Sequence, residues 1–105
     1  MVEGMHPNIP KTVEPLICEF QALPFVEKMI LFGSRAFGDH DDRSDIDLAL
    51  VGLISRPQWA RIRERSYQYR TLYWVSTVHW NRNPPALQRR ILETGVIIYD
   101  KKAAR

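Results

Sequence analysis

Two aspartates separated by a single residue interrupt an apolar stretch near the middle of this 105-residue chain. They are Asp45 and Asp47, in the segment LFGSRAFGDHDDRSDIDLAL that spans residues 31–50. Because side chains alternate across a strand, both carboxylates are expected on the same face. Carboxylates so close together repel each other, and a divalent cation removes the conflict. Mg²⁺ is typically held by one or two carboxylates together with substrate phosphates. The pair therefore indicates metal-assisted phosphoryl or nucleotidyl transfer.

A Gly-Ser pair upstream of the aspartates supplies the complementary part of such a site. Gly33 allows the backbone to approach a phosphate closely or to adopt a positive φ. If Ser34 begins a helical turn, its free N–H groups point at an anion and its hydroxyl adds a hydrogen bond. We therefore predict that Gly33, Ser34 and Arg35 bind the nucleotide. A lone Gly-Ser or Asp-x-Asp is a weak signal, but the combined pattern G-S-x(10)-D-x-D between two strand-like segments favours function.

Hydrophobic periodicity predicts the elements that must position these residues. Residues 13–20 repeat apolar side chains at helical spacing, and a second helix is expected from residue 56 to about residue 70. Strands are expected over residues 25–32, 46–51 and 72–80, with a closing helix from residue 84 and a short strand over residues 96–99. The predicted fold is a small α/β (α+β) domain with a mixed sheet of three to four strands and about three helices. It spans residues 1–105, with flexible tails at 1–10 and 101–105.

Helix boundaries and helix faces give more detailed expectations. Thr12 is predicted to cap the first helix, and Ser55–Gln58 has the form of a capping box for the second. In the closing helix, Leu87, Ile91 and Leu92 are expected to point inward. Each of these expectations depends on local sequence alone.

Charge is distributed unevenly along the chain. The net charge of +3 combines −5 over residues 1–55 with +8 over residues 56–105. A basic half can attract nucleic acid, nucleotide phosphates or an acidic protein. The simpler interpretation is a solvated helix face that displays Arg61, Arg63, Arg65 and Arg70.

Composition limits the class of protein. No apolar run approaches the roughly 20 residues that span a bilayer, so no membrane association is expected. Cys18 is the single cysteine, which excludes an internal disulfide and fits a reducing compartment. Its apolar neighbours predict that it packs in the core. We expect a soluble, cytoplasmic protein.

The segment LFGSRAFGDHDDRSDIDLAL resembles the signature of the DNA polymerase β-type nucleotidyltransferase superfamily, in its minimal nucleotidyltransferase (MNT) branch. The segment ALQRRILETGVIIYD also resembles the closing helix and strand of such proteins. The resemblance implies the nucleotidyltransferase fold, with Asp45 and Asp47 as catalytic residues that bind Mg²⁺ or Mn²⁺. It further implies that Gly33 and Ser34 grip the phosphates of ATP or another nucleoside triphosphate.

The same resemblance implies a protein partner. Members of this branch are commonly paired with a small all-helical protein of the HEPN or substrate-binding type. In several such pairs the helical protein is a toxic ribonuclease, and the MNT protein is an antitoxin that moves AMP from ATP onto a tyrosine of the toxin. We therefore expect a hydroxyl of a partner protein as the acceptor. Direct binding of nucleic acid by the basic half is the less favoured alternative.

One position departs from the family pattern. The family places a third carboxylate on the next strand, and Ser76 occupies that position here. No aspartate or glutamate occurs between residues 65 and 92, so realignment does not restore one. His79 is three positions away, on the opposite face of a regular strand, and is expected to be structural or exposed. Two hypotheses follow: an active nucleotidyltransferase, or a module of the same fold that has lost most chemistry and binds a helical partner.

Overall fold

The computed structural model of the chain describes residues 6–38, 41 and 43–102. Its helices are α1 (Glu14–Gln21), α2 (Ser34–Phe37), α3 (Arg56–Gln68) and α4 (Pro85–Thr94), with single 3-10 turns η1 (Lys11–Val13) and η2 (Trp80–Arg82). Its strands are β1 (Lys28–Phe32), β2 (Ile46–Val51), β3 (Val75–His79) and β4 (Val96–Asp100). The predicted order of elements is confirmed, although β1 and β3 are shorter than expected.

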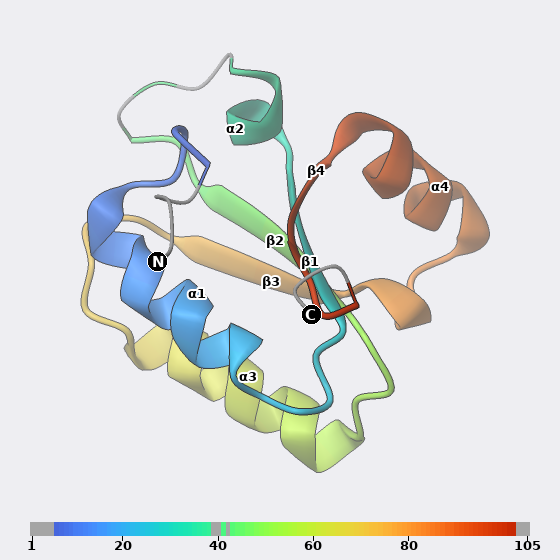
Figure 1. Cartoon of the computed structure of the whole chain (residues 1–105). Helices are drawn as coiled ribbons and strands as arrows, with labels where there is room; N and C mark the ends of the chain where they lie inside the picture. Colours follow the sequence, from blue (N-terminus) through green and yellow to red (C-terminus); the bar gives the residue numbers. More distant parts are fainter. Residues whose placement is uncertain (1–5, 39–40, 42, 103–105) are drawn as a thin grey trace.

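The strands form one mixed sheet in the order β3-β2-β1-β4. β1 runs antiparallel to β2 and β4, whereas β2 and β3 are parallel. Helices α1 and α3 cover one face of this sheet, and α4 lies against the other (Figure 1). This architecture confirms the predicted fold class.

The two faces bury cores of different size. Between the sheet and α1 and α3 lies the larger cluster of buried side chains: Ile9, Val13, Leu16, Ile17, Phe20, Val26, Met29, Leu31, Ile46, Leu48, Leu50, Ile54, Ile62 and Val75. Under α4 the cluster consists of Ile30, Ala49 and Ile91. Burial of apolar area is the main stabilising contribution to such a fold, so the α1 and α3 face supplies most of it.

The beginnings of the two longer helices follow different rules. The Ser55 side chain accepts from the Gln58 N–H, and the Gln58 side chain accepts from the Ser55 N–H, which confirms the capping box. The prediction that Thr12 caps the first helix is wrong. The chain enters α1 through the η1 turn, where the Val13 N–H donates to the Pro10 carbonyl at 2.9 Å, so a backbone oxygen satisfies this N–H.

The faces of α4 and α1 also correct two expectations. Ile91 is buried, but Leu87 and Leu92 are 41% and 50% exposed, because α4 meets the sheet along one narrow stripe. Cys18 is exposed rather than packed, since it lies on the outer side of α1. In the described part of the chain, no helix combines the length and the apolar character that crossing a membrane requires.

Parts of the expected tails contact the rest of the chain where the structure describes them. Ile9 is buried, and the Asn8 side chain donates to the Arg35 carbonyl at 2.7 Å. Lys101 binds the Glu27 carbonyl through its N–H and the Pro24 carbonyl through its ammonium group. These contacts join Asn8, Ile9 and Lys101 to the rest of the domain. Residues 1–5 and 103–105, and positions 39, 40 and 42 of the acidic loop, lie outside the described residues.

Candidate functional site

The Gly-Ser turn and the aspartate strand meet at one point of the sheet. In the antiparallel pairing of β1 and β2, Phe32 lies opposite Asp47. Gly33 follows with φ 76° and ψ −158°, a backbone conformation that favours glycine. A Cβ built on Gly33 would collide with the carboxylate oxygen Oδ2 of Asp47. The backbone of the turn therefore lies directly against this carboxylate.

The two aspartates lie at the start of β2 and influence each other. Ile46 and Leu48 are fully buried on the α1 and α3 face, so Asp47 points to the opposite face, as predicted from strand alternation. Asp45 is exposed and Asp47 is partly buried. Burial raises the pKa of the Asp47 carboxyl, and the negative charge of Asp45 raises it further. The site thus concentrates negative charge beside the Gly-Ser turn.

Ser76 lies beside Asp47 in the sheet. The parallel register of β2 and β3 pairs these two residues, and paired residues on neighbouring strands point to the same face. Among the described residues, no group of three or more His, Cys, Asp or Glu side chains could hold a metal ion. Asp45 and Asp47 are the two neighbouring carboxylates that could hold a cation here. Such a pair fits Mg²⁺, which completes its coordination with waters and substrate phosphates.

His79 has a structural place on the other face of the sheet. It is buried, its Nε2 lies 2.8 Å from the Gly52 carbonyl oxygen, and its ring stacks on that of Trp59 at 5.4 Å. With Nε2–H as the donor, the ring holds the loop after β2. His79 does not point toward Ser76, which agrees with the structural role expected for it.

Arg35 lies apart from the surface of the site. Ser34 is the first residue of the short helix α2 and is partly exposed beside Gly33, whereas the next residue, Arg35, is only 4% exposed. The Arg35 guanidinium donates to backbone carbonyls. The burial of Arg35 among backbone carbonyls was not predicted from the sequence. Any residue can provide a backbone carbonyl, so no pattern of side chains indicates which residues accept these hydrogen bonds.

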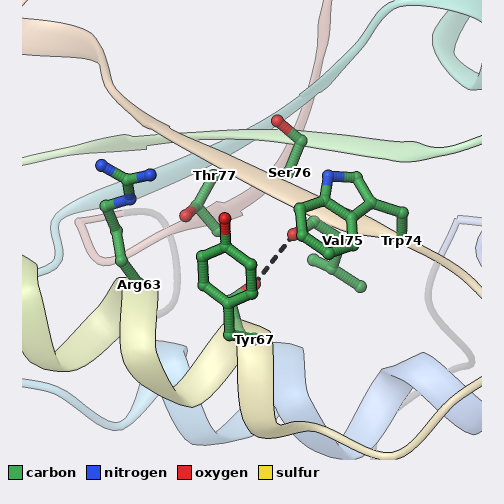
Figure 2. Close-up of a pocket in the computed structure, with 7 residues that line it drawn as sticks. Arg63, Tyr67, Trp74, Val75, Ser76 and Thr77 are labelled. Atoms are coloured by element: carbon green, nitrogen blue, oxygen red, sulfur yellow. Dashed lines mark hydrogen bonds between the residues drawn. The ribbon is translucent and has the colours of Figure 1, made fainter.

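A small pocket, here called the α3–β3 pocket, opens beside Ser76. It is lined by Arg63, Ser66, Tyr67, Trp74, Val75, Ser76 and Thr77. Figure 2 shows Arg63 and Tyr67 extending from α3 toward β3, while Ser76 points away from α3. The Ser66 hydroxyl donates to the Val75 carbonyl at 2.9 Å and holds the helix to the strand. The exposed rings of Tyr67 and Trp74 pack edge to face with centroids 5.0 Å apart.

The element order and the mixed sheet are those of the nucleotidyltransferase class of domains. A family model described as "Polymerase beta, Nucleotidyltransferase" matches residues 14–104, and the chain belongs to this family. No curated protein shows significant sequence similarity to the chain.

Two solved structures show the same fold. One is described as a toxin-antitoxin with AMP-PNP; it has a TM-score of 0.63 and 18% identity, over 89% of this chain and 74% of that one. The other is a candidate nucleotidyltransferase from Sulfolobus solfataricus, with a TM-score of 0.54 and 24% identity over 88% of this chain and 80% of that one. At these identities the likeness establishes the fold.

Proposed function

We propose that the protein is a nucleotidyltransferase that binds a nucleoside triphosphate with Mg²⁺, transfers the nucleoside monophosphate to a hydroxyl of a partner protein, and releases pyrophosphate. The observation that carries this proposal is the contact between the Gly33 backbone and the Asp47 carboxylate, with Asp45 close enough to raise the pKa of Asp47. This contact supports the proposal, because it brings the turn that we assign to phosphate next to the carboxylates that we assign to metal. Triphosphate and metal bind there together.

Each residue of the site has a defined part in this reaction. Asp45 and Asp47 would hold Mg²⁺ or Mn²⁺, which would supply positive charge to the phosphates of the substrate. Ser34 donates its hydroxyl to a phosphate oxygen, and the first N–H groups of α2 are free of intrahelical partners. Gly33 keeps the backbone close enough for the turn and the carboxylates to contact the same triphosphate. These roles need little movement, because the fold already brings the groups together.

The partner is proposed from the resemblance and from one solved structure. The protein with a TM-score of 0.63 is described as part of a toxin-antitoxin with AMP-PNP. We therefore infer that this chain is the antitoxin of a pair, that ATP is its donor, and that its acceptor is a tyrosine of a small all-helical HEPN-type protein. The partner docks along the α3–β3 pocket, on the α3 side of the edge strand β3, and its acceptor reaches around this edge to the opposite face, where Ser76 lies next to Asp47. The exposed cation of Arg63 suits an acidic segment of the partner.

A second candidate function is favoured by Ser76. A serine beside Asp47 gives neither a base at neutral pH nor a good metal ligand, so the chain could bind its partner and inhibit it without transfer. In that case nucleotide binding contributes little to inhibition, and the docking surface carries the function.

One experiment tests the principal proposal. The purified protein is incubated with Mg-ATP and the product of the adjacent gene, and the mass of each chain is measured. We expect the partner to gain one AMP, and the Asp45→Asn and Asp47→Asn variants to lose this gain. Unchanged partner mass with the wild-type protein, or unchanged labelling with both variants, contradicts the proposed transfer.

Ser76→Asp separates the two candidate functions. A third carboxylate next to Asp47 is expected to strengthen Mn²⁺-dependent nucleotide binding, because it adds an oxygen ligand on the same face. If only Ser76→Asp labels the partner, while the wild-type chain binds and inhibits it, the binding module is the correct interpretation.

A further inference from the structure

Arg35 joins three segments of the chain that are distant in sequence. Its Nη1 donates to the Asn8 carbonyl oxygen at 2.7 Å, and its Nε donates to the Ser44 carbonyl oxygen at 3.1 Å. A longer contact of 3.5 Å joins Nη2 to the Asp41 carbonyl oxygen. The guanidinium carbon also lies 5.3 Å from the centre of the Tyr73 ring, just ahead of β3. One side chain of α2 thereby contacts the N-terminal segment, the loop that enters β2, and the segment that enters β3.

These contacts use the special geometry of arginine. A guanidinium presents five N–H donors in a rigid planar fork and stacks on aromatic rings, whereas an ammonium group is a compact point charge. A buried charge is costly unless hydrogen bonds compensate it. At 4% exposure, the Arg35 guanidinium obtains that compensation from backbone carbonyls. The Asn8 side chain closes the arrangement by donating to the Arg35 carbonyl at 2.7 Å.

The position of Ser44 connects this arrangement to the site. Ser44 immediately precedes Asp45, and Arg35 immediately follows Ser34. The Nε contact therefore fixes the backbone that enters the aspartate pair relative to the turn that carries Gly33 and Ser34. Asp45 itself precedes β2 and is exposed, so the ladder of the sheet begins only after it. Arg35 supplies a restraint at that point.

We propose that Arg35 is a positioning residue: its buried guanidinium sets Asp45 against the Gly33–Ser34 turn, so that the carboxylate pair is arranged before metal and triphosphate bind. This inference rests on the proposed function and replaces the direct nucleotide contact expected for Arg35 from sequence. The guanidinium acts through the Ser44 backbone and does not touch phosphate. Groups that orient metal ligands in this way change metal affinity about 10- to 100-fold when they are removed.

Arg35→Lys and Arg35→Met distinguish positioning from direct phosphate binding. The measurement is the affinity of each variant for Mn-ATP by calorimetry. A positioning fork cannot be replaced by an ammonium group, so we expect both variants to lose affinity alike, by about 10-fold or more. If the lysine variant keeps wild-type affinity while the methionine variant loses it, the charge binds phosphate and the proposal is overturned.

Asn8→Ala provides the second variant, because it removes the amide that donates to the Arg35 carbonyl and leaves the guanidinium bonds to backbone carbonyls in place. We expect it to weaken Mn-ATP binding about threefold or more. Lys11→Ala, an exposed neighbour on the same segment, serves as the matched control and should bind as the wild type does. Wild-type affinity in Arg35→Met, which removes the guanidinium bonds, overturns the positioning role alone. A wild-type chain that binds no Mn-ATP overturns the proposed function instead.

Discussion

At the scale of single residues, Gly33 is the most constrained position of the site. Its φ of 76° strains any residue with a Cβ, and that Cβ would displace the Asp47 carboxylate. Gly33→Ala should therefore lower stability by about 1 kcal/mol or more and also weaken Mg-nucleotide binding. Denaturant unfolding and calorimetry measure the two effects.

Gly38 offers a matched control for this substitution. Its φ is 84°, but no atom of the described residues lies within 4 Å of a Cβ built there. Gly38→Ala should share the loss of stability and retain nucleotide binding. Equal losses of nucleotide affinity in both variants would show that backbone strain, rather than contact with Asp47, explains the effect.

Asp47 predicts a dependence of stability on pH. Burial and the charge of Asp45 raise its pKa above the value in the unfolded chain, so the folded protein binds more protons between the two values. Stability therefore falls as pH rises through this window, and the cost stays in full above it. Without divalent cations, Asp47→Asn should be more stable than the wild type at neutral pH, and the difference should shrink at about pH 3. Denaturant unfolding at both pH values measures it.

With Mg-ATP bound, the order of stability should be reversed, and the wild type should be more stable than Asp47→Asn. A ligand that binds only the folded state stabilises it, so Mg-ATP should raise the stability of the wild type and leave Asp47→Asn nearly unchanged. An Asp47→Asn variant that is no more stable than the wild type at neutral pH would contradict the proposed cost of the buried carboxylate.

The residue scale also shows what sequence could establish about the site. The direction of the Asp47 side chain follows from alternation along a strand, which is a local property. The place of Ser76 beside Asp47 was implied by the family resemblance, because the register between β2 and β3 is not local. The burial of Arg35 could not be predicted in this way. Its acceptors are backbone carbonyls of Asn8 and Ser44, and only the assembled fold brings them together.

At the scale of elements, helix capping gives a prediction about α3. The reciprocal bonds of Ser55 and Gln58 satisfy N–H groups that the helix itself leaves free. Ser55→Ala should lower the free energy of unfolding by about 1 kcal/mol and leave nucleotide binding intact. Thr12→Ala is the control, since no side-chain cap bond begins α1, and we expect little change in denaturant unfolding. Equal costs in both variants would contradict the assignment of the cap.

Strands and helices were predicted correctly where the local hydrophobic pattern matched the burial of side chains in the fold, and incorrectly where it did not. The strand over residues 46–51 was predicted with its observed bounds, because both faces of β2 are covered and all its residues except Asp47 are apolar. The predicted strand over residues 72–80 was too long. Leu72 is exposed outside β3, and Trp80 turns into η2. On α4, spacing placed Leu87 and Leu92 inward, but the small core beneath this helix accommodates only Ile91.

At the scale of the whole molecule, the basic residues of the second half of the chain lie in different surroundings on the surface. The basic half of the chain supplies the arginines of α3, but these are not equivalent. Arg65 pairs with Glu19 at 2.6 Å across to α1. Arg61 borders the groove between α1 and α3, whereas Arg63 borders the α3–β3 pocket beside Ser76. Of these positions, Arg63 is the one beside the edge strand β3, whose Ser76 pairs with Asp47 on the opposite face of the sheet.

This difference in position predicts which arginine of α3 contacts a protein partner. If the acceptor protein docks along the α3–β3 pocket, Arg63→Glu should weaken the complex about tenfold or more, since like charges then face each other. Arg61→Glu makes the same change of charge one helical half-turn away and should have a much smaller effect. Surface plasmon resonance with the immobilised partner measures both. Mg-ATP affinity should be the same in both variants, because neither arginine is assigned to the nucleotide.

The same pair of variants separates a protein partner from nucleic acid. Non-specific binding of a polyanion depends on total charge and falls steeply with salt, so Arg61→Glu and Arg63→Glu would weaken RNA binding equally. A protein partner that docks at the α3–β3 pocket should instead lose more affinity with Arg63→Glu than with Arg61→Glu when both are measured at the same salt concentration. Equal losses of partner affinity in both variants would remove the α3–β3 pocket as the docking surface, while leaving the carboxylate pair and its nucleotide untouched.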